Sequence, residues 1–150
     1  DEDKIIEELQ QFVSNQSHQS FHKYSAICLT NKDGERKPLW RWTKENRLDE
    51  IIIPKKAVDV KYIKMLNTEV VEDITLKKNI LSNLEKISGD FRQEEIKEMW
   101  RKFKKKNVFI SEFEGHVSSG YYIRQFVEDF GKQLGYLGMA LDITRIKIVI

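Results

Sequence analysis

The chain has 150 residues, the length of a single domain, and its 40% hydrophobic residues suffice for a buried core. Lysine and arginine exceed aspartate and glutamate by only 26 to 24, so net charge indicates no class of partner. The sequence has no long apolar run, no recognisable signal peptide and no cysteine pair, which favours an intracellular, cytoplasmic protein without a membrane span. Because the first residue is Asp1 rather than methionine, we expect that an upstream segment has been removed.

The first thirty residues predict a helix, a loop and a strand. Acidic residues in the first turn and apolar residues at helical spacing predict an amphipathic helix over Asp1 to Val13. Residues 14–20 are polar and predict a loop, whereas residues 23–30 predict a strand. The single cysteine, Cys28, lies in this strand, where we expect a buried structural residue; the alternative is a reactive thiol.

A turn, a short aromatic helix and a second strand are predicted next. Asn31 to Gly34 has the composition of a turn, and Pro38 suits the first turn of a helix that carries Trp40 and Trp42. These tryptophans are two positions apart and cannot share a helix face, so we expect one in the core and the other partly exposed. Alternating apolar residues predict a strand over residues 57–66.

The middle of the chain predicts a helical hairpin. Helices are expected over about residues 75–87 and 93–106, with Gly89 able to adopt the left-handed conformation that ends the first helix. Their apolar residues can bury each other or pack on the main sheet. We regard about residues 72–107 as an insertion into the domain, and expect a strand over residues 108–118 after it.

The second of these helices ends in a basic cluster, Arg101 to Lys106, in which five cations surround one phenylalanine. Lys102, Lys104 and Lys105 are therefore candidates for binding RNA phosphates, and each such contact would add salt dependence. The alternative is a solvated helix end whose charges match the helix dipole, which is the commoner role of such a run.

The run from Val117 to Gly131 is the most informative part of the sequence. Ser118 to Gly120 predict a flexible turn with free backbone N–H groups, and we expect this turn to cap the following helix. Apolar residues recur every four positions from Tyr122 and predict one buried helix face. Arg124 leaves this face near the helix N-terminus, where a cation opposes the helix dipole, so a carboxylate or phosphate partner would explain it better. The simpler alternatives are a surface arginine and a core tyrosine.

Further blocks extend this pattern. They are Lys23-Tyr24-Ser25-Ala26-Ile27, Lys37-Pro38-Leu39-Trp40 continuing to Ile53-Pro54, the run Ser119-Gly120-Tyr121-Tyr122-Ile123-Arg124 with Asp129-Phe130-Gly131 after it, and the closing stretch Gly135 to Ile148. The last block includes a strand predicted over residues 143–150. Together the blocks resemble the TruB-type tRNA pseudouridine synthases, over about residues 1–66 and 108–148.

This resemblance implies the fold and the activity. The implied fold is α+β, with a mixed, mainly antiparallel sheet of a pseudouridine-synthase-like domain, and with the helical hairpin as an insertion. Residues 1–150 would be a single partial catalytic domain that supplies four or five strands of the sheet. The implied activity is isomerisation of a T-loop uridine of tRNA to pseudouridine by base flipping, with RNA, in particular the tRNA T arm, as partner. No cofactor or metal is implied, and the three histidines lack zinc-ligand spacing.

The resemblance also implies roles for four residues. Arg124 would pair with the nucleophilic aspartate, hold it ionised and orient it. Tyr122 would pack beside the flipped uracil, and Ile143 would close the apolar side of the same pocket. Arg145 matches the second of two arginines in the family pattern and is expected to bind substrate, whereas Thr144 departs from the first.

The nucleophile itself is missing from these 150 residues. The family carries it in a Gly-x-x-Asp-Pro run ahead of the helix that starts this chain, and no Asp-Pro pair occurs in the sequence. We therefore expect this chain to form one wall of an active site, to be inactive alone and to associate with the upstream part of the same domain. The alternatives are a catalytically inactive RNA-binding module and a protein-interaction module with the same fold.

Overall fold

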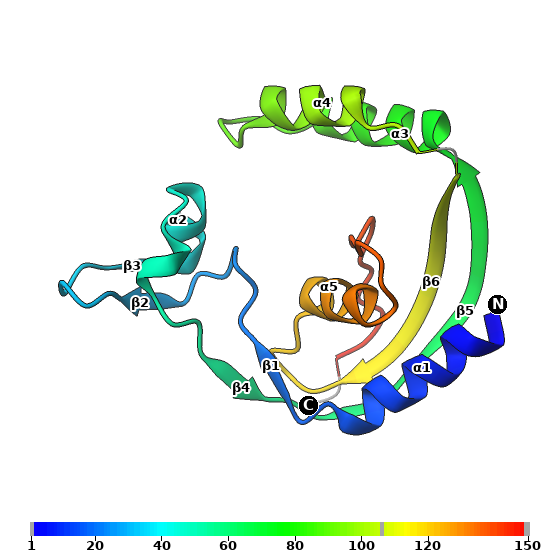
Figure 1. The fold of residues 1–150 in the computed structure, drawn as a ribbon, viewed down its shortest axis with the longest axis horizontal. Coiled ribbons are helices and arrows are strands. Elements are labelled where there is room, and N and C mark those ends of the chain that lie inside the picture. Colours follow the sequence, from blue (N-terminus) through cyan, green and yellow to red (C-terminus); the bar gives the residue numbers. More distant parts are fainter. Residues whose placement is uncertain (1, 106, 149–150) are drawn as a thin grey trace. The chain divides into compact units, whose positions relative to one another are not determined.

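A computed structural model describes residues 2–105 and 107–148 of the chain. Its backbone divides into two compact units, unit 1 from Asp1–Lys64 and Gly115–Ile150 and unit 2 from Met65–Glu114. The described residues form five α-helices and several short antiparallel strand pairs, so the predicted α+β class is confirmed (Figure 1).

In chain order the elements are α1 (Glu2–Asn15), β1 (His18–Ser20), β2 (Cys28–Thr30), β3 (Arg36–Pro38), α2 (Leu39–Lys44), the 3-10 helix η1 (Leu48–Glu50), β4 (Lys55–Ala57), β5 (Val60–Glu72), α3 (Asp73–Glu85), α4 (Gln93–Lys102), β6 (Asn107–Val117) and α5 (Ile123–Gln133). Where the structure describes the chain, the strands pair two by two: β1 with β4, β2 with β3, and β5 with β6. The expected single sheet of four or five strands is therefore wrong for these residues. Pro38 ends β3 and Pro54 precedes β4, and a proline has no N–H group with which to extend a ladder.

Helices α1 and α5 form the aromatic core of unit 1. Phe12 of α1 lies edge-on to Phe126 and Phe130 of α5, with ring centroids 5.8 and 5.5 Å apart, and the two α5 rings stack at 5.8 Å. Leu9 is 2% exposed beside them. The amphipathic helix predicted at the N-terminus is confirmed from Glu2 onward and ends two residues later than expected, whereas Asp1 lies outside the described residues.

A pair of glycines brings the segment after α5 close to this helix. A Cβ on Gly138 would lie 2.1 Å from the carbonyl oxygen of Val127, and a Cβ on Gly131 would lie 2.8 Å from the nitrogen of Gly138. Only glycine allows such an approach. Beyond this contact, residues 141–148 are exposed and irregular, so the strand predicted over residues 143–150 is wrong for its described part. A strand needs a neighbour for its backbone groups, and residues 149–150 lie outside the described residues.

The β2–β3 hairpin packs against α2. Its predicted turn is confirmed, because the Gly34 amide donates to the Asn31 carbonyl at 3.1 Å and Gly34 has a φ of +83°. Trp42 is fully buried and its indole N–H donates to the Lys37 carbonyl at 3.1 Å. Trp40 is 42% exposed, so the expected division between the two tryptophans is also confirmed.

The strand predicted over residues 23–30 is reduced to β2. The Leu39 amide donates to the Ile27 carbonyl at 2.7 Å, so the segment before β2 bonds to the start of α2 rather than to a second strand. The prediction that Cys28 is buried is wrong, because the first position of this short strand is exposed. In this three-residue strand only the middle side chain is even partly buried, which apolar sequence alone does not reveal.

The polar segment over residues 14–20 contains β1, so the prediction that the whole segment is a loop is wrong. This strand pairs antiparallel with β4, with His18 opposite Ala57, Gln19 opposite Lys56 and Ser20 opposite Lys55. Gln19 is 2% exposed. A polar strand gives no apolar alternation, so its pairing was invisible in the sequence.

The strand predicted over residues 57–66 is split into β4 and β5. Between them, the Asp59 amide donates to the Ser118 hydroxyl oxygen at 3.0 Å, and the Ser118 amide donates to the Asp59 carbonyl at 2.8 Å. β5 then continues to Glu72 and pairs with β6, which confirms the strand predicted over residues 108–118 apart from one residue at each end.

Unit 2 contains the predicted helical hairpin. Figure 1 shows α3 and α4 side by side between β5 and β6 in the chain path. Leu76 and Ile80 of α3 are buried, and Gly89 between the helices has a φ of +92°, so the predicted left-handed glycine is confirmed. α4 ends at Lys102, earlier than predicted, because Phe103 is extended with a ψ of 127°.

Candidate functional site

The start of α5 is held by a buried glutamine from a distant strand. The Gln19 side chain donates from Nε2 to the Tyr122 carbonyl at 2.9 Å, and its Oε1 accepts from the Tyr122 amide at 2.9 Å. Both polar groups of this 2% exposed amide are thus satisfied by one backbone position, 103 residues away in sequence. Tyr122 is the N-cap residue of α5 and has no side-chain capping bond, so the predicted cap from Ser119 or Gly120 is wrong.

Three side chains surround the half-buried Tyr122 ring. Its hydroxyl is hydrogen-bonded to the Ser25 hydroxyl at 2.9 Å. Phe21 lies edge-on to it, with ring centroids 6.0 Å apart. The Lys56 ammonium nitrogen lies 4.0 Å from the Tyr122 centroid and 5.1 Å from the Phe21 centroid, which is a cation–π arrangement with two rings.

The turn before α5 lies against this cluster. Gly120 has a φ of +78°, and a Cβ there would lie 3.2 Å from the Lys56 ammonium nitrogen. The neighbouring Tyr121 is turned inward, and its hydroxyl donates to Gln16 Oε1 at 2.5 Å. Burial raises the pKa of Tyr121 well above its usual range, although the hydrogen bond to Gln16 acts in the opposite direction. Tyr121 is therefore a neutral structural residue, and Tyr122 is the tyrosine whose ring joins the Lys56 cluster.

Arg124 is exposed in the first turn of α5, two positions after Tyr122. Within residues 2–105 and 107–148, no carboxylate lies at ion-pair distance from its guanidinium. The helix dipole is unfavourable to a cation at this end. The prediction that Arg124 leaves the apolar face is confirmed, and its charge remains available to an anion outside the described residues.

A buried histidine ties the same loop to α5. The Tyr24 amide donates to His22 Nδ1 at 3.3 Å, so the ring proton lies on Nε2, which donates to Glu128 at 3.2 Å. His22 is 6% exposed. Because Ser25 follows within the same turn, this contact positions the hydroxyl that reaches Tyr122.

A polar hollow of about 450 Å³ lies beside this cluster in unit 1. It is lined by Gln11, Phe12, Asn15, Gln16, His18, Gln19, Ser20, Lys55, Asp129 and Gln133. Asp129 accepts a hydrogen bond from Gln125 at 2.9 Å, one turn earlier on α5. The Asp129 carboxylate is therefore bonded within α5, and no ion pair joins it to Arg124.

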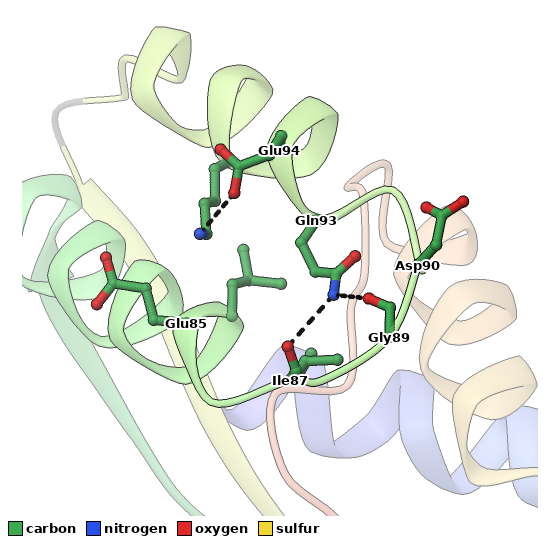
Figure 2. Close-up of a pocket in the computed structure, with 8 residues that line it drawn as sticks. Glu85, Ile87, Gly89, Asp90, Gln93 and Glu94 are labelled. Carbon is green, nitrogen blue, oxygen red and sulfur yellow. Dashed lines mark hydrogen bonds and ion pairs between the residues drawn. The ribbon is translucent and has the colours of Figure 1, made fainter.

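A second hollow of about 380 Å³ lies in unit 2 at the loop between α3 and α4 (Figure 2). Gln93 donates to the carbonyls of Ile87 and Gly89, and its Oε1 accepts from the Phe91 amide at 2.7 Å. The side chain therefore closes the loop by its own hydrogen bonds. The polar groups of Gln93 are therefore already satisfied within the hairpin.

Among the described residues, no hydrogen bond, ion pair or ring contact joins the remaining predicted site residues to Tyr122. Ile143 is 46% exposed and Arg145 is exposed, both in the irregular segment after α5, so their proposed substrate contacts stay predictions. Lys102, Lys104 and Lys105 are exposed residues of unit 2. Lys102 pairs with Glu98 at 3.1 Å, one turn earlier on α4, as expected for a solvated helix end.

Sequence reasoning missed three residues of this cluster: Gln19, Phe21 and Lys56. Each lies in a segment whose pattern predicted nothing functional, and their contacts with Tyr122 join positions that are 66 to 103 residues apart. Ser25 was in a block quoted for its resemblance, but without a role. Only the pairing of β1 with β4, which places Lys56 opposite Gln19, indicates that Lys56 belongs to this cluster.

The described residues contain no group of three or more histidine, cysteine, aspartate or glutamate side chains that could hold a metal ion. None of the described helices is both long and apolar enough to span a membrane. In comparisons with known proteins, no family model, no curated protein and no solved structure matches the chain.

Proposed function

We propose that this chain is the later part of a pseudouridine-synthase-like catalytic domain that isomerises a T-loop uridine of tRNA. One observation carries the proposal: the hydrogen bond of 2.9 Å between Ser25 and Tyr122. These residues belong to two of the sequence blocks that resemble TruB-type enzymes, and 97 positions separate them. Chance similarity gives no reason for two such blocks to meet at one side chain.

The chemistry explains why a tyrosine and an arginine are needed together. In the isomerisation the N1–C1′ bond of uridine breaks and a C5–C1′ bond forms, while C5 loses a proton and N1 gains one. Substrate and product are isomers, so no oxidant or co-substrate is consumed. A carboxylate must attack during this exchange, and an arginine beside it keeps it ionised and oriented. The base must also leave its stack, and an aromatic ring offers it a replacement surface.

The residues of this chain would divide these tasks. Tyr122 offers its ring to the flipped uracil and is fixed at its backbone by Gln19 and at its hydroxyl by Ser25. Arg124 is two residues further on and has no carboxylate partner in the described part of the chain. In this proposal the nucleophilic aspartate comes from the upstream part of the domain, and Arg124 receives it.

A second candidate is an RNA-binding module with the same fold and no chemistry. The sequence favours it in one respect, since no Asp-Pro pair occurs in these 150 residues. The two candidates differ in turnover but not in RNA binding. Release of the C5 hydrogen therefore separates them.

The test uses the chain joined to its upstream coding sequence and a T-arm stem-loop RNA labelled with tritium at C5 of uridine. We expect tritium release by this protein, and a loss of about 100-fold or more in Arg124→Ala, because an electrostatic contact at the reacting carboxylate is removed. Lys132→Ala, at the other end of the same helix, is the matched control and retains activity. Full activity of Arg124→Ala contradicts the role of Arg124, whereas RNA binding without any release favours the second candidate.

A further inference from the structure

Lys56 carries a charge that the described residues do not neutralise. Its ammonium lies over Tyr122 and Phe21, and in residues 2–105 and 107–148 no carboxylate is at ion-pair distance from it. Aromatic faces attract a cation but carry no formal negative charge. The half-buried ammonium therefore keeps its capacity to donate hydrogen bonds to an anion.

Strand pairing directs Lys56 toward the start of α5. Residues directly opposite in an antiparallel pair point to the same face, and Lys56 lies opposite Gln19. The Gln19 side chain is bonded to the Tyr122 backbone, so this face of the β1–β4 pair meets Tyr122. Lys55 points to the other face because successive strand residues alternate, and it is exposed.

The turn before α5 contains a glycine, Gly120, beside the Lys56 ammonium. A Cβ at Gly120 would lie 3.2 Å from the Lys56 nitrogen, and the positive φ of Gly120 is itself strained for other residues. Contacts with Tyr122, Phe21 and a backbone turn thus restrict the positions of the ammonium. Such confinement lowers the entropy that the side chain loses when it binds a ligand.

We propose that Lys56 binds the backbone phosphate of the nucleotide whose base lies against Tyr122, an inference that rests on the function proposed above. A compact ammonium binds phosphate as a point charge through hydrogen bonds of about 2.8 Å. With its nitrogen 4.0 Å from the Tyr122 centroid, Lys56 places a phosphate within one nucleotide of the stacked base. Tyr122 and Lys56 then hold the two ends of the same flipped nucleotide.

The test measures binding of a T-arm stem-loop RNA to the full 150-residue chain by fluorescence anisotropy at several KCl concentrations. We expect Lys56→Met to weaken binding about tenfold at low salt and to lower the salt slope by about 0.7 to 1. We expect Lys56→Arg to restore most of the affinity and most of the salt slope. Lys55→Met makes the same charge change at the neighbouring, exposed position, which borders the polar hollow and has no contact with the Tyr122 ring, and has a much smaller effect. Circular dichroism melting checks that each variant is folded.

A second arm replaces single phosphates by uncharged methylphosphonates on either side of the target uridine. We expect the unaltered chain to bind one of these modified RNAs more weakly than normal RNA. We expect Lys56→Met to bind that modified RNA and normal RNA equally well. Equal effects of Lys56→Met and Lys55→Met, or no methylphosphonate effect at either linkage, overturn the role of Lys56 alone. If the unaltered chain binds no RNA, this inference is wrong, whereas the proposed function is judged separately by tritium release from the protein joined to its upstream sequence.

Discussion

Two lysines of unit 1, Lys37 and Lys56, stand in matched aromatic settings but have opposite electrostatic ones. Each ammonium nitrogen lies 4.0 Å from a ring centroid, that of Trp42 for Lys37 and that of Tyr122 for Lys56. Lys37 also contacts two carboxylates, whereas in the described part of the chain Lys56 contacts none. Lys37 is therefore part of the charge network of the fold, whereas Lys56 is available to bind an anionic ligand.

The neutralised region is a closed network of charges around Trp42. Lys37 is 6% exposed and pairs with Glu35 at 3.0 Å and with Glu45. Burial lowers the pKa of Lys37, but its hydrogen bonds to Glu45 and Glu35 outweigh this effect and leave the pKa raised. Arg47 joins the same carboxylates to η1 through Glu50, at 2.5 Å. Every charge in this network has a partner within the β2–β3 hairpin, α2 or the segment after it.

The unneutralised region has the same aromatic scaffold without the carboxylates. Lys56 and Arg124 are both cations near the start of α5, and the carboxylates of that helix have other partners: Glu128 contacts His22 and Asp129 accepts from Gln125. Like charges held near each other repel unless an anion lies between or beside them. The difference between the regions therefore separates a site that stabilises the fold from one suited to an external anion.

The largest expected effect tests the scaffold of the neutralised region. Trp42→Ala removes a fully buried indole beneath Lys37, so we expect the free energy of unfolding to fall by about 3–5 kcal/mol. Urea unfolding followed by circular dichroism measures it. Trp40→Ala is the matched control: its side chain is 42% exposed, and we expect a loss of at most about 1 kcal/mol. Equal losses would show that α2 is not anchored by Trp42.

A smaller effect compares the two lysines directly. Lys37→Met removes the least exposed cation that Glu35 and Glu45 share and leaves them only with exposed or half-exposed arginines, so we expect a clear fall in the urea midpoint. Lys56→Met removes only a cation–π contact, and we expect a change of about 0.5–1 kcal/mol or less. If the Lys56 variant loses as much stability as the Lys37 variant, Lys56 belongs to the fold and the contrast between the regions is lost.

The smallest expected effect is a pH dependence in the neutralised region. The hydrogen bond from Arg47 lowers the pKa of Glu50 from 4.5 to about 2, with a further contribution from Asn31 and against the effect of burial. Because the folded pKa is the lower one, ionised Glu50 stabilises the fold above about pH 4.5, and this contribution is lost as the pH falls toward 2. Urea midpoints measured between about pH 6 and about pH 2.5, a range that covers most of this window, report it. Glu50→Gln should flatten the curve, and an unchanged curve would contradict the assignment.

Local features of the fold were predictable because neighbours in sequence cause them. The apolar faces of α1 and α5, the turn at Gly34 and the hairpin glycine Gly89 follow from periodicity and from backbone preferences within a few residues. The exposure of Arg124 followed from its place off the apolar face of α5. In each case the cause lies within one or two turns of chain.

Features that depend on pairing between distant segments were not predictable. The sheet was expected as one piece, yet β1 and β2 each find a different partner strand, and Cys28 is exposed because β2 is short. β1 itself has a polar sequence that reads as loop. Its strand character comes only from its bonds to β4, which no local pattern encodes.

The sequence alone determined the helices, the hairpin and the two residues, Tyr122 and Arg124, that carry the functional hypothesis, because local periodicity and residue type suffice for these. Only the tertiary structure decided what surrounds them. Gln19, Ser25 and Lys56 reach Tyr122 through hydrogen bonds and a ring contact with residues far along the chain. Such contacts depend on strand register and on which charges are already neutralised, and both are properties of the folded chain rather than of any short segment.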